Sequence, residues 1–273
     1  MQFKTLTTED NTITVIDDTY HEAMHSLSGA YQEALNMHVI PSQVLSKQGQ
    51  IYVLDIGFGL GYNVLALCVE AMKQKHTAFY TIISLEKNTD IRSAMDFVSF
   101  KDERDSIYGL LKKSARGEKI TTDYFSHSVL YGDARQLLSL LPDHYFDAVF
   151  HDPFSPAKNP EMWTVDFFKK LYQKCNDDCI VTTYSAAMHI RAAMKKGGFI
   201  VGKGPQVGRK KEGTIATKNN DAIEPLGESF IALLEKNPKA LPFTDPTLCD
   251  TPEAIRQRRK LAMAMFKKGL QAP

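Results

Sequence analysis

The segment "LDIGFGLGYN", residues 54–63, decides how the rest of this 273-residue chain is interpreted. An apolar run reaches Asp55, a turn with glycines at positions 57, 59 and 61 follows, and a helical pattern begins after it. Glycine adopts positive φ and lets the backbone approach a ligand closely. A strand, a glycine-rich turn and a helix in this order predict the first unit of a ligand-binding sheet. The alternative is a turn that only allows tight packing of the helix on the strand.

Apolar runs alternate with helical patterns along most of the chain. Several runs are apolar at successive positions, which is typical of strands that are covered on both faces. Repeated strand and helix units predict an α/β fold with a doubly wound, mostly parallel, seven-stranded sheet of the Rossmann-like class. Ligands in this architecture bind at the carboxyl ends of the strands. The seven runs are "IYVLDI" (51–56), "FYTIISLE" (79–86), "HSVLYGD" (127–133), "FDAVFHD" (146–152), "CIVTTY" (179–184), "FIVGKG" (199–204) and "SFIALLE" (229–235).

Two extensions flank the predicted sheet. Residues 1–49 fit the repeat less well, and we expect them to pack on the main domain, over the edge of the sheet. Residues 50–236 form the predicted main domain. Residues 237–273 are first rich in proline and then follow a basic helical pattern. The sequence therefore predicts one large domain with an extension at each end.

Composition and charge exclude several classes of protein. The net charge is +1, so any contact with nucleic acid depends on local basic patches. The N-terminus lacks the features of a signal peptide, and the longest apolar run, 63–72, is too short to span a bilayer. Four scattered cysteines do not form a disulfide framework. We expect a cytoplasmic protein with no membrane segment.

Two patterns suggest a metal site only weakly. Cys175 and Cys179 have the spacing of half a zinc site, but no second pair matches them. "HEAMH", residues 21–25, fits the H-E-x-x-H pattern but lacks its usual continuation. We expect no metal.

Two further acids lie at the ends of predicted strands. Glu86 ends the second run, where a carboxylate can accept hydrogen bonds from ribose hydroxyls. Asp133 ends the third run, where it either accepts from the amino group of adenine or caps a helix. Together with Asp55 they place acids at three successive strand ends, which helix capping alone does not explain. The glycine motif and these acids resemble the cofactor site of S-adenosyl-L-methionine (SAM)-dependent methyltransferases.

The segment "FHDPFSPAKNPEMW", residues 150–163, leads from a strand to the only tryptophan of the chain. Asp152 precedes a proline, which favours an extended backbone at the acid. "DPF" resembles a short form of the loop with which methyltransferases act on amino groups. Asp152 is then expected to orient an amine and stabilise its growing charge, while Pro153 and Phe154 shape the pocket. The alternative is a buried helix cap or turn acid.

The order of several motifs makes the resemblance more specific. "GFGLGYN", "LEK", "YGD", "DPFSPAKNPEMW", "TTYSAAMHIRAAMKKGGF" and "GRKKEGTIAT" resemble the MnmC-like methyltransferases of bacterial tRNA. The resemblance implies SAM-dependent conversion of 5-aminomethyl-2-thiouridine, at the wobble position, to 5-methylaminomethyl-2-thiouridine. It also implies that Asp152 is the catalytic acid, although Pro153 stands where the family usually has glycine. Many relatives carry a fused FAD-dependent oxidase domain, for which this chain is too short, so a separate flavin-dependent or other amine-generating enzyme is an expected partner.

The resemblance and the motifs together give three sets of predicted site residues. The catalytic set is Asp152, Pro153 and Phe154. The SAM-binding set is Asp55, Gly57, Phe58, Gly59, Gly61, Asn63, Glu86, Lys87, Gly132 and Asp133. The set expected to contact tRNA is Glu33, Lys158, Asn159, Trp163, Arg209, Lys210, Arg258 and Arg259, although Trp163 also fits a buried core position. Two other functions remain open: an aminopropyl transferase or other small-amine methyltransferase of the same fold, and a non-enzymatic RNA-binding protein.

Overall fold

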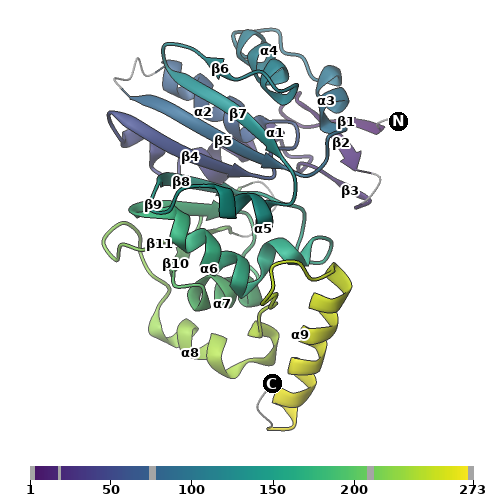
Figure 1. Ribbon diagram of the computed structural model, residues 1–273, viewed down its shortest axis with the longest axis vertical. Helices are drawn as coiled ribbons and strands as arrows, with labels where there is room; N and C mark the ends of the chain where they lie inside the picture. Colours follow the sequence, from purple (N-terminus) through teal and green to yellow (C-terminus); the bar gives the residue numbers. More distant parts are fainter. Residues whose placement is uncertain (1–3, 18–19, 74–77, 208–211, 270–273) are drawn as a thin grey trace.

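A central sheet of eight strands organises the computed structural model, which describes residues 4–17, 20–73, 78–207 and 212–269 (Figure 1). The five strands at its centre are parallel to one another, and the outer pairings are antiparallel. In spatial order the strands are β10 (Ile200–Lys203), β11 (Thr214–Thr217), β9 (Cys175–Thr183), β8 (Phe146–His151), β4 (Gln50–Ile56), β5 (Phe79–Glu86), β7 (Phe125–Tyr131) and β6 (Ile120–Thr121).

The chain order reverses between β4 and β8. From β4 the chain builds outward through β5 to β7, and it then returns to build β8 and β9 on the other side. At such a reversal the loops after two neighbouring strands diverge and leave a crevice. The functional site is therefore expected beside the ends of β4 and β8.

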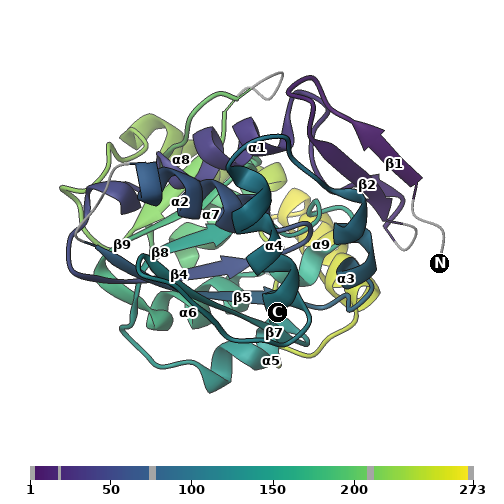
Figure 2. The same cartoon turned by 90° about the horizontal axis from the view of Figure 1, so that it is seen from above.

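Helices cover both faces of the sheet (Figure 2). The core of one face contains α2 (Tyr62–Lys73) and α4 (Arg104–Ala115), and the core of the other contains α6 (Val165–Lys174) and α7 (Met188–Lys196). Neighbours along β4 alternate between these cores, as the pleat of a strand requires. The remaining helices are α1 (Ala30–Glu33), η1 (Ala34–Val39), η2 (Val44–Ser46), α3 (Ile91–Ala94), η3 (Met95–Phe97), α5 (Ala134–Leu137), η4 (Leu138–Leu140), η5 (Pro160–Trp163), α8 (Glu228–Lys236), η6 (Pro238–Ala240) and α9 (Pro252–Lys267).

The N-terminal residues form a small antiparallel sheet that lies beside the pocket end of the main sheet. Its strands are β1 (Lys4–Thr7), β2 (Ile13–Asp17) and β3 (Glu22–Ala23). The hydroxyl of Tyr62 in α2 donates to Ile13 O at 2.7 Å, which joins the small sheet to that helix. The π-helix η1 then packs on α2 and β9. The N-terminal sheet and η1 therefore lie close to the carboxyl ends of the central strands, where the site is expected.

The structure corrects one predicted strand. "SFIALLE" lies in α8, and the strand next to β10 is instead β11, which lies within the motif "GRKKEGTIAT". The apolar residues Phe230, Ile231 and Leu234 follow helical spacing and contact α7 and its neighbours. Short apolar runs do not distinguish the two structures by periodicity alone. The other six predicted strands are confirmed as β4, β5, β7, β8, β9 and β10. Over the described ranges, no helix is both long and apolar enough to cross a membrane.

Candidate functional site

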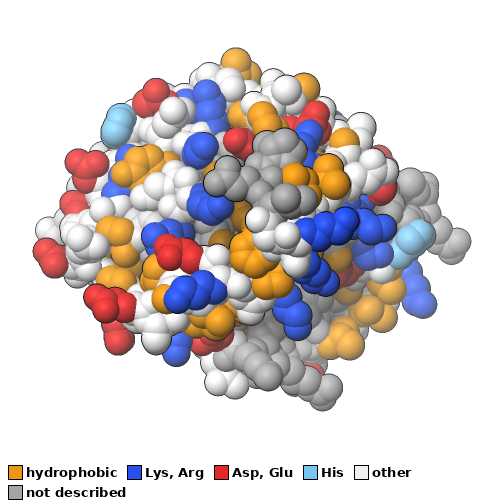
Figure 3. Space-filling view, turned by 90° about the horizontal axis from the view of Figure 1, so that it is seen from below, with side chains coloured by type: hydrophobic (Ala, Val, Ile, Leu, Met, Phe, Trp, Pro, Cys, Tyr) orange, Lys and Arg blue, Asp and Glu red, His pale blue; other side chains and the backbone are white. Residues whose placement is uncertain are grey.

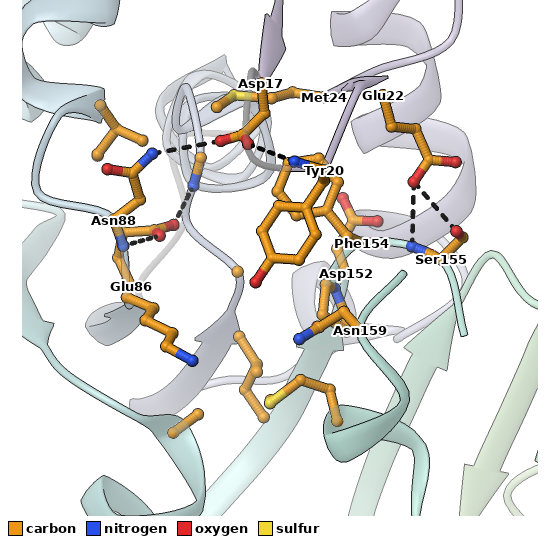
Figure 4. A pocket seen from close by; sticks show the side chains of 18 of the residues that line it. Asp17, Tyr20, Glu22, Met24, Glu86, Asn88, Asp152, Phe154, Ser155 and Asn159 are labelled. Carbon is orange, nitrogen blue, oxygen red and sulfur yellow. Dashed lines mark hydrogen bonds between the residues drawn. The ribbon is translucent and has the colours of Figure 1, made fainter. Parts of the chain in front are cut away.

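A pocket of about 530 Å³ opens at the carboxyl ends of the central strands (Figure 4). Its walls come from the residues that follow β4, β5, β7, β8 and β9, and from the N-terminal sheet. Such a position agrees with the reversal of strand order between β4 and β8. Loops from five strands therefore converge on one cavity.

The glycine turn after β4 brings the backbone of the next loop close. Gly57 has φ of +89°, and a Cβ at this position would lie 2.7 Å from Asp152 O. Gly59 has φ of +51°, and its N–H donates to Glu86 Oε2 at 2.9 Å. Residues with side chains rarely adopt these φ values. The glycines thus bring Asp152 and Glu86 to the same turn.

Glu86 links the end of β5 to the N-terminal sheet. Its Oε1 accepts from the N–H of Asn88 at 2.7 Å, and Asn88 Nδ2 donates to Asp17 Oδ2 at 3.3 Å (Figure 4). Burial raises the pKa of Glu86, while hydrogen bonds from the backbone of Gly59 and Asn88 act in the opposite direction. The carboxylate lies in the wall of the pocket, held by backbone donors.

Asp152 follows β8 directly and is fixed from several sides. Its N–H donates to Ile56 O at 2.9 Å, which continues the pairing of β8 with β4. Asn63 Nδ2 donates to its Oδ2 at 3.1 Å. His38 Nε2 lies 3.6 Å from the same oxygen, and His38 Nδ1 lies 3.0 Å from Thr182 Oγ1. The carboxylate is therefore held between α2 and η1 at the floor of the pocket.

Four predicted SAM-binding residues lie behind the pocket wall instead of in it. Asp55 is fully buried, and Ser84 Oγ donates to its Oδ2 at 2.8 Å. Burial raises the pKa of Asp55 to about 7. Phe58 packs against Gly61, and Asn63 turns to Asp152. The predicted residues that do line the pocket are Gly57, Gly59, Glu86, Lys87, Gly132 and Asp133.

Asp133 caps a helix. Its Oδ1 accepts from Arg135 N at 3.0 Å at the start of α5, and the guanidinium of Arg135 also pairs with the carboxylate. Burial alone would raise the pKa of Asp133, but these hydrogen bonds lower it below its ordinary value. Of the two roles considered for this acid, the structure contains the cap, and Asp133 also lines the pocket.

The segment after Asp152 is held by aromatic residues. Phe154 stacks on Tyr20 of the N-terminal segment, with ring centroids 4.3 Å apart. Trp163 is fully buried, and its Nε1 donates to Phe154 O at 2.9 Å. Of the two positions considered for Trp163, the structure contains the buried core one, and the indole is not exposed for stacking on a base. The hydroxyl of Tyr184 donates to Pro153 O at 2.9 Å, which fixes the turn on its other side.

The pocket is rich in acids. Among the described lining residues, Lys87 is the one lysine, and no arginine lines the cavity. Such a wall favours a cationic ligand and repels phosphate groups. Its carboxylate side chains are Asp17, Glu22, Glu33, Glu86, Asp133, Asp152 and Glu161.

The residues expected to contact tRNA are scattered. Glu33 and Asn159 line the pocket, and Glu33 Oε2 accepts from Ser26 N at 3.0 Å. Lys158 is exposed beside the pocket. Arg209 and Lys210 lie outside the described residues.

Two predicted tRNA contacts are structural. Arg258 donates to Thr244 O at 2.6 Å and pairs with Asp250. Arg259 donates to Leu241 O at 2.6 Å and to Lys239 O at 3.0 Å. Both guanidinium groups attach α9 to the segment before it. Some of their N–H donors are thus used within the protein, and contact of these two arginines with RNA stays a prediction.

Sequence reasoning missed the contribution of the N-terminal segment. Asp17, Tyr20 and Glu22 line the pocket, and His38 reaches Asp152 from η1. The sequence analysis gave none of these residues a role in the pocket, although Glu22 lies in "HEAMH" and π-helices such as η1 are frequent at functional sites. "HEAMH" does not form the helix that a zinc protease requires, because residues 22 and 23 form β3. Across the described part of the chain, no cluster of three or more His, Cys, Asp or Glu residues is arranged to hold a metal ion.

Comparison with known proteins gives consistent results. Residues 101–219 match a family described as S-adenosyl-L-methionine-dependent methyltransferase. The crystal structure of MNMC2 from Aquifex aeolicus is 32% identical, with a TM-score of 0.86, over 96% of this chain and 85% of that one. Uncharacterized protein MJ0670 of Methanocaldococcus jannaschii is 30% identical over 96% of this chain and 74% of its own length.

Longer relatives share part of their length with the chain. The tRNA 5-methylaminomethyl-2-thiouridine biosynthesis bifunctional protein MnmC of Pseudomonas fluorescens is 28% identical over 72% of this chain. The match spans 32% of that relative, about a third of its length.

Proposed function

The chain belongs to the MnmC-like family of SAM-dependent methyltransferases, and on that premise we propose that it methylates an aminomethyl group on tRNA. The substrate in this proposal is 5-aminomethyl-2-thiouridine at the wobble position, and the product is 5-methylaminomethyl-2-thiouridine. The bifunctional relatives are named for the biosynthesis of that product, which supports the choice. The proposal places the protein in the cytoplasm, where a separate amine-generating enzyme supplies the substrate.

SAM is the cofactor, and the pocket fits it. When bound, SAM supplies a methyl group on a positively charged sulfonium. Gly57 and Gly59 keep the turn after β4 clear of side chains, and Glu86 presents a half-buried carboxylate beside that turn. Under this proposal these three residues, with Lys87 and Gly132, hold the cofactor. The acidic wall suits its charge.

The position of the Asp152 carboxylate is the observation on which the proposed reaction rests. Its carboxylate lies at the reversal of strand order, in a pocket lined by other acids, and contacts from Asn63 and His38 hold it. An amine that has lost its extra proton to water would form a bond from nitrogen to the methyl carbon as the bond from that carbon to sulfur breaks, so positive charge would pass from sulfur to nitrogen. A fixed carboxylate accepts a hydrogen bond from the amine and stabilises that charge. We assign Asp152 the orientation of the amine and not the removal of its proton.

The test identifies the methylated product and compares its rate of formation in the original protein and in an Asp152 variant. The protein is incubated with SAM carrying a labelled methyl group and with tRNA that lacks this methylation, and the digested nucleosides are identified by mass spectrometry. We expect labelled 5-methylaminomethyl-2-thiouridine. In Asp152→Asn, turnover should fall by about 100- to 1000-fold while SAM binding is retained, because an oriented charge at the reacting centre is lost.

The matched control removes a carboxylate from the opposite end of the sheet. Asp177 is exposed in the first part of β9, away from the strand ends that form the pocket. Asp177→Asn should keep full turnover. Labelled polyamine without labelled tRNA would instead support a small-amine methyltransferase, and the proposed function would be rejected.

A further inference from the structure

A second cavity runs along α9, next to the acidic pocket. Its walls are one face of the helix and a short stretch of the loop that follows Asp152. The helix residues are spaced by three and four positions, so they share one face. The lining residues are Pro156, Ala157, Phe243, Arg256, Arg259, Lys260, Met263, Ala264 and Lys267, and we call this cavity the α9 groove.

The α9 groove and the acidic pocket share one loop. Residues 152–155 line the pocket, and the next two residues, Pro156 and Ala157, line the groove. Arg256 holds the loop against α9, since its Nη2 donates to Ala157 O at 2.9 Å and to Lys158 O at 3.1 Å. A chain molecule with one unit bound in the pocket would therefore reach the groove by passing directly over this loop.

The charge of the α9 groove is opposite to that of the pocket. Its described lining contains four cationic side chains and no carboxylate. Arg259 is engaged by backbone carbonyls, and Arg256 also pairs with Glu253 at 3.7 Å. Lys260 and Lys267 are exposed and take part in no ion pair among the described residues. Figure 3 looks at this end of the molecule and shows Lys and Arg side chains gathered beside hydrophobic ones.

We propose that the α9 groove binds the phosphate backbone of the RNA next to the nucleotide that enters the acidic pocket, with Lys260 and Lys267 as the phosphate contacts. This inference rests on the proposed function and deepens it. Phosphates are repelled by the carboxylates of the pocket, so the backbone must lie outside when a single nucleotide is turned inward. Lysine contacts to phosphate dominate the affinity of proteins for nucleic acids. Pro156, Phe243 and Met263 add an apolar surface beside the charges.

The test reverses the two exposed charges. The variant Lys260→Glu/Lys267→Glu is compared with Lys113→Glu/Lys119→Glu, which changes two exposed lysines in or next to α4, at the far end of the molecule (Figure 1). Affinity for an RNA hairpin with the sequence of the anticodon arm is measured at several salt concentrations. Affinity for SAM and the midpoint of thermal unfolding are measured in parallel.

The expected result separates the two pairs of lysines. The groove variant should bind the hairpin about tenfold or more weakly, and the slope of log affinity against log salt should fall in magnitude by about 2, since two phosphate contacts are lost. SAM affinity and thermal midpoint should not change. The α4 variant should bind the hairpin like the original protein. Equal RNA affinity in the groove variant and the original protein, or an equal loss in both variants, would overturn the inference.

This binding experiment and the methylation assay together distinguish the inference from the proposed function. If the original protein methylates no tRNA, yet the groove variant loses RNA binding and the α4 variant does not, the proposed reaction is rejected and phosphate binding in the α9 groove is supported. If tRNA is methylated and the groove variant retains the full RNA affinity and its salt dependence, the proposed reaction is supported and phosphate binding in the α9 groove is rejected. The milder variant Lys260→Ala/Lys267→Ala, which should reduce the salt slope by the same amount, tests the result if the charge reversal disturbs folding.

Discussion

The acidic pocket and the α9 groove lie on two sides of one loop and use charge in opposite ways. In the pocket, carboxylates are held by hydrogen bonds, as Glu86 is by Gly59 and Asn88. In the groove, Lys260 and Lys267 extend into solvent. Held charges in a cavity orient a ligand over short distances, whereas exposed charges attract a polyanion and are screened by salt. Under the proposed function, the difference predicts that chemistry and RNA affinity reside in separate sets of residues.

The comparison would fail if a change confined to the pocket also abolished RNA binding. Gly57→Ala is the most severe such change, because its Cβ would lie 2.7 Å from Asp152 O and its φ of +89° is strained for alanine. We expect kcat/KM for methyl transfer to fall by about 100-fold or more, since a displacement of the reacting groups by about 1 Å has that effect. Enzyme kinetics and hairpin binding check this, and hairpin binding should be retained.

Gly109 provides the matched control for this substitution. It lies within α4, its φ is not positive, and nothing lies within 4 Å of a Cβ built there. Gly109→Ala should keep full activity and raise the free energy of unfolding by about 0.5–1 kcal/mol, since alanine favours a helix. Equal kinetics in the two variants would show that the close approach of Gly57 to Asp152 is not needed.

His38 tests whether the N-terminal segment acts through the held carboxylate. His38→Ala removes the contact between its Nε2 and Asp152 Oδ2 at 3.6 Å. We expect kcat to fall by about 10- to 100-fold, because the carboxylate loses one of the groups that orient it. SAM affinity should be retained, since His38 does not line the pocket.

The conservative variant His38→Gln separates orientation from simple packing. Glutamine fills part of the space and places an amide donor toward Asp152, so part of kcat should return. If the alanine and glutamine variants lose kcat equally and both lose SAM affinity, His38 only supports the fold. Stopped assays of kcat and calorimetric titration with SAM measure the two quantities.

Much of the fold follows from local pattern. Six of the seven apolar runs are strands, because parallel strands covered on both faces are apolar at successive positions. The rule that ligands bind at the carboxyl ends of strands then places Glu86 and Asp152 in one pocket. These predictions depend on residues that are close in the chain or on the general geometry of a parallel sheet.

The remainder depends on contacts between distant residues. Asp55 ends a strand like Glu86, yet its side chain turns inward to Ser84, and neither periodicity nor spacing encodes that direction. Tyr20 reaches Phe154 across more than a hundred positions of sequence. Likewise, the basic residues of α9 form one charge run, and only the folded chain shows which of them meet backbone carbonyls.

The buried acid behind the pocket wall gives a prediction that depends on pH. Burial raises the pKa of Asp55 from 3.8 to about 7, so the folded protein holds a proton that the unfolded chain releases. This group therefore stabilises the fold below about pH 4, and that contribution declines as pH rises to about 7, by at most about 1.4 kcal/mol per pH unit. Asp55→Asn lacks this decline. Urea unfolding across the range should show the variant gaining stability relative to the original protein as pH rises, and a constant difference would contradict the buried acid.

Two neighbours on α9 give the smallest effect and the sharpest test of how charge is used. Arg259 donates to Leu241 O and Lys239 O and lies over the ring of Phe243, whereas the side chain of Lys260 is exposed. Arg259→Ala should lower the free energy of unfolding by about 1–2 kcal/mol, because two backbone carbonyls lose a charged donor and Phe243 loses its contact with the guanidinium. Lys260→Ala should change it by less than about 0.5 kcal/mol and should weaken only RNA binding, in a manner that salt abolishes. Adjacent residues of the same charge would then differ in function because one is held by the protein and the other by its ligand. Equal losses of stability in Arg259→Ala and Lys260→Ala would contradict this distinction. The arginines of α9 could then not be called structural in contrast to the lysines of the groove.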